Sequence, residues 1–360
     1  MINPFTGYPV ATDEHVDPLL KTNMPVAMGI SGGKDSTAMA WATTNHLNLM
    51  GHTGPRLLIH SDLGKIEWAD SIRICQQISD ILGVELVTVR RPSGGMVERW
   101  MSRWDANVQR WLDLSCVKLI LPWSTPSMRF CTSELKTAII CRELNRRYKG
   151  MDILSASGIR RQESSGRAKK PVSQESKRMK REFNVGLDWN PIIEWSLDQV
   201  WDTHRSYNLP IHEAYSTYES SRVSCMFCIM SSLDDLIKSS LCPGNQDTYR
   251  ELVDLENTST FGFQDRHWLG DIAPHLLTLN QQINHQVAKK AGAERQRLEA
   301  QIPTHLLYEK GWPNVMPTYS EAALLGQIRS QVARVMHLTP TFIDPTEIMH
   351  RYAQLMSQKK

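Results

Sequence analysis

Short apolar runs alternate with longer helical patterns along residues 25–159 of the chain. The apolar runs are rich in aliphatic residues and lie at 25–30, 56–63, 84–91 and 151–159. Stretches with helical character separate them, at 35–50, 67–83 and 131–148. Strands separated by helices predict parallel βαβ units, and aliphatic runs suit strands that are covered on both faces. We therefore expect an α/β fold with a doubly wound parallel sheet.

The rest of the chain predicts a helical extension of this fold. Residues 190–208 indicate a strand end followed by a helix, with Ser196 as its N-cap and Gln199 completing a capping box. From about residue 245 onward the periodicity is helical. We expect an N-terminal extension over 1–24, an α/β domain over 25–244 and a helical C-terminal region over 245–360.

The composition indicates a globular protein but does not decide whether it binds nucleic acid. The 360 residues are 41% hydrophobic, enough for a full core, and the net charge of +3 neither requires nor excludes nucleic acid. No apolar stretch approaches the roughly 20 residues of a membrane span, and the N-terminus lacks the pattern of a secretion signal. We expect a cytoplasmic protein without membrane contact, in which the seven cysteines are buried thiols or metal ligands rather than disulfides.

The segment SGGKDS, residues 31–36, joins the first expected strand to the first expected helix. Glycines let backbone N–H groups approach an anion closely, and a helix N-terminus adds a favourable dipole. Lys34 supplies a full positive charge, while Ser31 and Ser36 supply hydroxyl donors. Neither the Walker A pattern nor G-x-G-x-x-G is present. The segment predicts a phosphate-binding loop, with a glycine-rich turn that binds nothing as the alternative.

Four cysteines have the spacing of a metal site. Cys225 and Cys228 form a C-x-x-C pair, with Cys131 upstream and Cys242 downstream. Four thiolates can close a tetrahedral site for Zn²⁺ or hold an iron–sulfur cluster. A redox pair or two core thiols is the alternative for a lone C-x-x-C. The other cysteines are expected in the core, at positions 75, 116 and 141.

Residues 160–181 hold nine lysines and arginines and only two glutamates. We expect a mobile basic loop, which is either a solvated face or a place where DNA or RNA phosphates are drawn in. Arg160 and Arg161 follow the fourth expected strand, where their guanidinium groups could stabilise a reacting phosphate. Four tryptophans could either stack bases or build a core; they are Trp100, Trp104, Trp111 and Trp123.

SGGKDS resembles the PP-loop signature of ATP pyrophosphatases and of phosphoadenylylsulfate (PAPS) reductases. Further stretches match the reductase-like branch of that superfamily in order: HSDLG (60–64) with Glu67, RFCTSELK (129–136), SGIRRQESSGRA (157–168), NPIIEWSLDQVW (190–201) and SRVSCMFC (221–228). The resemblance covers roughly residues 25–245. The Glu-Cys-Gly-[Ile/Leu]-His motif of the sulfate-pathway reductases is absent, and no cysteine follows Cys242. In its loop and cysteine pattern the chain is similar to DndC-type proteins of DNA phosphorothioation, which are associated with a [4Fe–4S] cluster.

This resemblance implies roles for individual residues. An adenine nucleotide would be bound by Ser31, Gly32, Gly33, Lys34, Asp35, Ser36, Asp62 and Gly158. The catalytic residues would be Lys34, Asp35, Arg160 and Arg161, with Asp35 helping to position Mg²⁺. The ligands of a [4Fe–4S] cluster, or of zinc as the alternative, would be Cys131, Cys225, Cys228 and Cys242.

The resemblance also implies an activity. It is that of an ATP pyrophosphatase which adenylylates an acceptor and so prepares it for sulfur incorporation, as in phosphorothioate-type modification of nucleic acid. DNA or RNA would then approach through the basic loop 160–181, and a cysteine desulfurase or other subunits of a modification complex would be partners. One alternative is a PAPS or adenylylsulfate reductase-like enzyme of sulfur assimilation. Another is a non-catalytic nucleotide-binding subunit of a defence or mobile-element complex.

Overall fold

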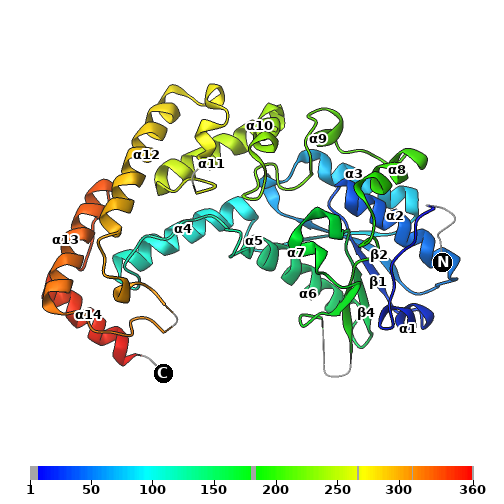
Figure 1. Cartoon of the computed structure of the whole chain (residues 1–360), viewed down its shortest axis with the longest axis horizontal. Coiled ribbons are helices and arrows are strands. Elements are labelled where there is room, and N and C mark those ends of the chain that lie inside the picture. Colours follow the sequence, from blue (N-terminus) through cyan, green and yellow to red (C-terminus); the bar gives the residue numbers. More distant parts are fainter. Residues whose placement is uncertain (1–6, 180–183, 266, 310, 359–360) are drawn as a thin grey trace. The chain divides into compact units, whose positions relative to one another are not determined.

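The chain forms two compact units in a computed structural model that describes residues 7–179, 184–265, 267–309 and 311–358 (Figure 1). Unit 1 comprises Met1–Met96 and Pro126–Gln246, and unit 2 comprises Val97–Thr125 and Asp247–Lys360. Residues 97–125, which we expected within the α/β domain, therefore pack with the C-terminal helices. Residues 1–6 of the expected N-terminal extension lie outside the described residues.

Unit 1 is built around a six-stranded sheet. Its strands are β1 (Val26–Gly29), β2 (Arg56–Asp62), β3 (Leu86–Arg90), β4 (Ile153–Ala156), β5 (Ser173–Glu175) and β6 (Gly186–Trp189). They lie in the order β3-β2-β1-β4-β6-β5, and all neighbours are parallel except β5, which runs antiparallel to β6. The sheet grows from β1 towards β3 on one side and from β4 on the other. The strand order thus reverses between β1 and β4, which is where open α/β sheets bind ligands at the carboxyl ends of their strands.

Helices cover both faces of this sheet (Figure 1). Val26 and Met28 of β1 are buried in one core, which also contains residues of α1 (Val16–Lys21), α2 (Lys34–Leu49), α3 (Ala69–Leu82) and α8 (Leu197–Ser206). Ala27, between them in sequence, is buried in the other core with α6 (Ala138–Arg147). This alternation follows from the two-residue period of a strand. The expected doubly wound α/β fold is confirmed.

The predicted start of α8 and the described part of the N-terminal segment both belong to unit 1. The Ser196 side chain accepts the Gln199 N–H at 3.2 Å, and the Gln199 side chain accepts the Ser196 N–H at 2.7 Å, which is the expected capping box.

Val10 and Leu20, from the described part of the N-terminal segment, are buried in the same core as β1. The Trp195 indole donates to the carbonyl oxygen of Pro9 at 2.8 Å. The N-terminal segment is thus part of the core rather than an appendage.

The expected mobile basic loop is replaced by regular structure over residues 160–179. It contains a 3-10 turn (Arg161–Glu163), α7 (Ser165–Ala168) and the edge strand β5. Arg160 is buried, and Arg161 pairs with Glu194 while donating to the carbonyl of Lys170 at 3.1 Å. The expectation of a mobile loop does not hold there, because antiparallel pairing with β6 and these ion pairs fix the backbone. Lys180 and Arg181 lie outside the described residues.

Shorter elements complete unit 1. They are the 3-10 turns Gly64–Ile66 and Pro243–Asn245, α5 (Phe130–Thr132), the π-helical turn η2 (Ser133–Thr137), α9 (Glu213–Ser216) and α10 (Leu233–Leu241). The stretch 131–148, expected as one helix, is thus divided among α5, η2 and α6. A π-helical turn is rare, and such turns are frequent at functional sites.

Unit 2 is helical, as expected for the C-terminal region. It contains α4 (Met96–Leu112) from residue 97 onward, α11 (Gln246–Ser259) from residue 247 onward, α12 (Leu279–Glu299), α13 (Tyr319–Val335), α14 (Pro345–Ser357) and the 3-10 turns Leu269–Asp271, Pro274–Leu276 and Thr304–Leu306. None of the helices within the described ranges is both long and apolar enough to cross a membrane.

The four tryptophans of residues 97–125 form part of the core of unit 2. Their side chains are all buried; they are Trp100, Trp104, Trp111 and Trp123. The rings of Trp100 and Trp123 meet edge to face, with centroids 5.4 Å apart, and Phe263 packs against both. The alternative that these tryptophans stack nucleic-acid bases is therefore wrong. The Trp-rich helix belongs to unit 2 because this apolar face is covered by the C-terminal helices.

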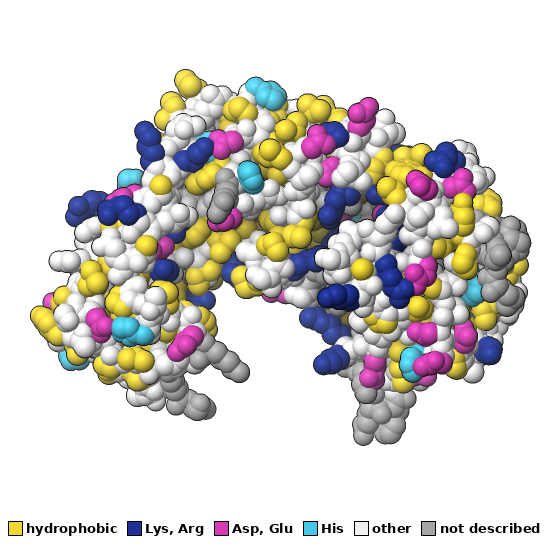
Figure 2. Space-filling view, viewed as in Figure 1, with side chains coloured by type: hydrophobic (Ala, Val, Ile, Leu, Met, Phe, Trp, Pro, Cys, Tyr) yellow, Lys and Arg dark blue, Asp and Glu magenta, His cyan; other side chains and the backbone are white. Residues whose placement is uncertain are grey.

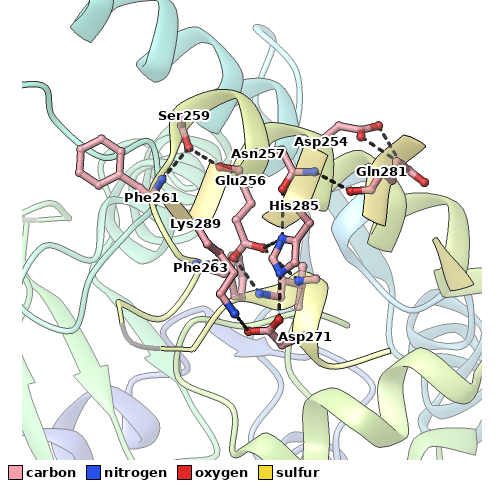
Figure 3. A network of polar contacts seen from close by, with 12 residues as sticks. Asp254, Glu256, Asn257, Ser259, Phe261, Phe263, Asp271, Gln281, His285 and Lys289 are labelled. Atoms are coloured by element: carbon pink, nitrogen blue, oxygen red, sulfur yellow. Dashed lines mark hydrogen bonds and ion pairs between the residues drawn. The ribbon is translucent and has the colours of Figure 1, made fainter. Parts of the chain in front are cut away.

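A buried polar network holds the turn that follows α11 (Figure 3). The Glu256 carboxylate is fully buried and accepts three backbone N–H groups at 2.7–3.0 Å, those of Phe263, Leu269 and Gly270. His285 lies beside it, with its Nε2 3.0 Å from Asp271, and Lys289 donates to the same aspartate at 2.8 Å. A carboxylate in this setting replaces the backbone acceptors that an irregular turn lacks.

Candidate functional site

The SGGKDS loop leaves β1 at its carboxyl end and enters α2. Gly32 has φ +75°, and a Cβ there would lie 2.9 Å from the carbonyl oxygen of Ser71 on α3, so only glycine lets the loop pass α3 this closely. Gly33 is the N-cap of α2, and no side-chain cap is made there. The first N–H groups of a helix lack intrahelical acceptors, and their dipoles favour an anion. The loop therefore has the backbone arrangement of a phosphate cradle.

Three charged side chains meet beside this loop. The Asp35 carboxylate accepts a hydrogen bond from Arg160 at 2.6 Å, and its other oxygen lies 3.5 Å from the Lys34 ammonium. Lys34 and Arg160 are both buried. Two cations share one carboxylate, so the cluster keeps a net positive charge next to the cradle and favours an anion there. Both oxygens of Asp35 are engaged, so its carboxylate does not fit a Mg²⁺ ligand while these pairs are made.

Gly158 brings the segment after β4 into the same place. A Cβ at Gly158 would lie 2.7 Å from the carbonyl oxygen of Asp35 and 2.9 Å from the amide nitrogen of Ser36. Backbone thus packs directly on backbone where the loop turns into α2. This contact positions the buried Arg160, two residues further on, to reach Asp35.

We expect Gly158→Ala to disturb the loop. The added methyl group meets backbone atoms that cannot swing aside, so we expect a loss of about 1–3 kcal/mol in the free energy of unfolding and weaker nucleotide binding. Gly166→Ala is the matched control, because a Cβ at Gly166 on α7 meets nothing within 4 Å. Thermal unfolding and calorimetric titration with ATP measure both effects. Equal behaviour of the two variants would contradict this account of Gly158.

Asp62 and Arg161 turn away from the loop. The Asp62 carboxylate accepts the Gly64 N–H at 2.6 Å and lies 3.6 Å from Arg90, so it stabilises its own turn at the end of β2. Arg161 faces Glu194. Of the residues that the resemblance assigns to catalysis, the structure brings together Lys34, Asp35 and Arg160.

Cys131 lies on α5, directly before the π-helical turn. The π-helical turn that follows α5 is fixed to the end of β2 by a hydrogen bond of 2.5 Å from the Ser61 hydroxyl to the Leu135 carbonyl. Burial raises the pKa of the Cys225 thiol to about 12, the neighbouring Lys136 lowers it, and the thiols of Cys228 and Cys131 raise it further. Cys225 is thus electrostatically coupled to Cys131 and Cys228.

The fourth predicted ligand, Cys242, is buried and has a different partner. It interacts with the hydroxyl of Tyr218 and raises the pKa of that group to about 12. Across the part of the chain that the structure describes, no three His, Cys, Asp or Glu side chains are arranged to hold a metal ion. The sulfur donors suit a soft metal or a cluster, but the four thiols do not form a closed coordination site.

A buried ion pair lies behind the loop, within the HSDLG motif and its glutamate. The His60 Nδ1 is 3.0 Å from the carbonyl oxygen of Ile30, and its Nε2 is 3.1 Å from the Glu67 carboxylate. Although burial opposes the charge, hydrogen bonds with Cys75 and Glu67 raise the pKa of His60 to about 10. The imidazolium therefore holds the residue before the loop and the Glu67 carboxylate.

Tyr215 of α9 is a site residue that the sequence did not indicate. Its hydroxyl oxygen accepts the backbone N–H of Lys34 at 3.3 Å and that of Val223 at 3.0 Å. The Lys34 ammonium lies 5.0 Å from the centre of its ring and donates to the carbonyl of Ser221 at 3.2 Å. No spacing rule marks this tyrosine, because it reaches the loop from a four-residue helix far along the chain.

Comparison with known proteins shows the family of this chain. The model of the phosphoadenosine phosphosulfate reductase domain matches residues 25–231, which is more than half of the chain. The sequence has no significant match among curated proteins. Among solved structures, PAPS reductase from Candida auris in a phosphate complex is 14% identical, with 57% of this chain and 92% of that chain covered and a TM-score of 0.35.

The U34-tRNA thiolase NcsA from Methanococcus maripaludis, solved with its [4Fe–4S] cluster, is 17% identical, with 84% of this chain and 86% of that chain covered and a TM-score of 0.35. Both TM-scores are too low to indicate what this chain does. None of these matches confirms a particular closeness to DndC-type proteins. Because the family model matches more than half of its length, the chain belongs to the phosphoadenosine phosphosulfate reductase domain family.

Proposed function

We propose that the chain is a PP-loop enzyme that cleaves ATP between its α- and β-phosphates to activate an acceptor for sulfur incorporation. An acceptor oxygen attacks the α-phosphorus, the bond to the β-phosphate oxygen breaks, and pyrophosphate leaves. A sulfur nucleophile then displaces AMP from the adenylylated acceptor. One observation carries this proposal: the phosphate cradle and the thiol-bearing segment are hydrogen-bonded to each other, through Lys34 to Ser221 and through Tyr215 to Val223.

The residues beside the cradle have separate roles in this reaction. The backbone of residues 31–36 holds the departing pyrophosphate, and the Lys34 ammonium stabilises the charge that develops on it. Arg160 keeps Asp35 paired and contributes the second positive charge. Because Asp35 is already shared by two cations, Mg²⁺ would enter with the nucleotide, bound to its phosphate oxygens. Arg161 and Asp62 have no part in this set, since both face their own partners.

The thiols would hold a metal cluster beside the nucleotide site. We propose Cys131, Cys225 and Cys228 as ligands of a [4Fe–4S] cluster, with Cys242 as the fourth and zinc as the alternative metal. An all-sulfur donor set suits both. The Met230 N–H donates to the Cys228 sulfur at 3.4 Å, as N–H groups do around cluster sulfurs. A bound cluster would supply or relay sulfur.

The surface near these thiols suits an anionic acceptor. Figure 2 shows several Lys and Arg side chains over the region of α6 and α7. Exposed Arg178 donates to the carbonyl of Ser133 on the π-helical turn at 3.1 Å, so part of the basic segment lies against the Cys131 region. Clustered positive charge attracts phosphodiesters. We therefore propose DNA or RNA as the acceptor, modified by sulfur, and a sulfur-donating desulfurase as a partner.

A reductase that takes PAPS is the second candidate, and the family to which the chain belongs favours it. Such an enzyme needs a cysteine nucleophile, and the C-terminal cysteine motif of the sulfate-pathway reductases is absent from the sequence. In this chain a thiol beside the cradle would have to act as the nucleophile instead. ATP turnover remains the proposal that these residues support better.

One set of assays on anaerobically purified protein separates these functions. We expect pyrophosphate release from Mg–ATP, stimulated by a nucleic-acid acceptor, together with brown colour and bound iron and sulfide. Sulfite release from PAPS with thioredoxin, without pyrophosphate release from ATP, would assign the reductase activity instead. ATP binding without any turnover would indicate a non-catalytic nucleotide-binding subunit. A colourless protein with one zinc would overturn the cluster while leaving the ATP reaction standing.

A further inference from the structure

Tyr215 occupies a position between the two halves of the site. Its hydroxyl oxygen accepts one N–H from the cradle, that of Lys34, and one from the thiol segment, that of Val223. Val223 is two residues before Cys225 in the sequence. A single oxygen atom thus ties the start of α2 to the segment that carries the C-x-x-C pair.

The elements around Tyr215 hold it in this place. The Glu213 N–H donates to the Asp70 carboxylate at 2.8 Å, and the Ala214 N–H donates to His212 at 3.0 Å. His212 in turn lies 3.2 Å from the Ser71 hydroxyl on α3. These bonds fix the backbone of α9 to the same helix on which Gly32 of the loop packs. Tyr215 therefore projects onto the cradle from a rigid support.

The hydroxyl can also contact a bound phosphate. Its oxygen lies 3.6 Å from where a Cβ of Gly33 would be, at the N-terminus of α2. Burial raises the pKa of Tyr215 well above its ordinary value, so the phenol keeps its proton while its oxygen accepts two N–H groups. A proton donated to an anion makes the same oxygen a stronger acceptor, because hydrogen bonds in a chain polarise one another.

We propose that Tyr215 is a positioning residue that couples phosphate binding at the SGGKDS loop to the order of the Cys225–Cys228 segment. The inference rests on the proposed function, since it requires that the loop bind the phosphates of ATP. A phosphate oxygen accepts a hydrogen bond from the Tyr215 hydroxyl, which keeps its proton, and the bond from the Val223 N–H tightens. The thiols are thereby held in place when the nucleotide is bound.

Amide hydrogen exchange of the full chain tests this coupling, with Tyr215→Phe as the variant. Phenylalanine keeps the ring beneath Lys34 and removes only the oxygen. Without nucleotide, we expect residues 221–226 to exchange about fivefold faster in the variant, corresponding to the loss of one hydrogen bond. With Mg–ATP, wild-type exchange in this segment should slow further, and the variant should lose that response while its ATP affinity, measured by calorimetry, changes less than tenfold. Tyr8→Phe is the matched control, because it removes a hydroxyl that donates to Asp202 at 2.8 Å and lies away from the loop.

Each outcome bears on one claim. Unchanged exchange of residues 221–226 in nucleotide-free Tyr215→Phe would overturn the link, whatever ATP does. An ATP response that survives in the variant would show Tyr215 to be merely structural. Absence of ATP binding to the wild type by calorimetry would overturn the proposed function and, with it, the phosphate half of the inference.

Discussion

Lys34→Ala should lower the rate of pyrophosphate release from ATP by at least about a hundredfold, the cost typical of removing one preorganised group that stabilises developing charge. Lys34 belongs to the phosphate cradle itself, and its ammonium is held by the carbonyl of Ser221 and by Asp35. A charge fixed in a buried site acts far more strongly than one in water. Arg160 cannot replace it, because its own guanidinium is committed to Asp35.

The same variant should remain folded. Asp35 keeps its hydrogen bond with Arg160 after the lysine is removed, so no buried carboxylate is left unpaired. Lys21→Ala, on α1, is the control for loss of a lysine charge in unit 1. Initial rates of pyrophosphate release, with thermal unfolding of the same preparations, measure both effects. Retention of more than a tenth of the wild-type rate by a folded Lys34→Ala protein would remove Lys34 from the reaction.

Strands β1, β2 and β4 of unit 1 could be predicted from the sequence because most of their residues are buried, on both faces of the sheet. The runs that became β1 to β4 are short and aliphatic, and helical periodicity separates them, so pattern alone identifies them. The edge strand β5 could not be predicted, because all three of its residues are polar and only Ser173 is buried. Its pairing with β6 depends on tertiary contacts rather than on an apolar pattern.

The sequence could not predict how the chain divides into two units. The tryptophans of α4 predicted a buried or base-stacking face, but not its partner. That partner begins more than a hundred residues later, at Phe261 and Phe263, whose rings contact Trp104 and Trp100. A contact at such separation leaves no local signal, so the expected boundary at residue 245 missed the helix that belongs with the C-terminal part.

Within the site, residues of the loop were predictable and their partners were not. Gly32, Gly33 and Lys34 lie in one contiguous motif. Glycine is needed there because the backbone packs closely, and lysine because it supplies positive charge. Asp62 and Arg161 also lie in stretches that resemble motifs of the family. The Asp62 side chain, however, bonds to its own turn, and the Arg161 side chain pairs with Glu194. Tyr215 has no motif at all and enters through α9. Sequence patterns therefore locate the cradle, whereas the orientation of each side chain depends on packing.

Glu256→Ala should destabilise unit 2 more than any surface change in the chain. The carboxylate is the acceptor for three buried backbone N–H groups, and alanine leaves all three without a partner. Each unsatisfied group costs about 1–3 kcal/mol, so we expect a loss of at least about 3 kcal/mol. Glu294→Ala on α12 is the control; its half-exposed carboxylate pairs with Arg297 at 2.7 Å, and its removal should change little. Urea unfolding followed by circular dichroism measures the difference.

The pH dependence of that difference identifies the carboxylate as its cause. Burial raises the pKa of Glu256 from 4.5 to about 7 in spite of its three N–H donors. Between these values the folded protein binds more protons than the unfolded one, so the contribution of Glu256 to stability falls as the pH rises from 4.5 to 7. This pKa shift corresponds to a change of about 3 kcal/mol in the contribution of Glu256 to the free energy of unfolding between pH 4.5 and 7. The gap between wild type and Glu256→Ala should therefore be larger at the acidic end than at the neutral end, whereas a gap independent of pH would show that folding does not raise the pKa of Glu256.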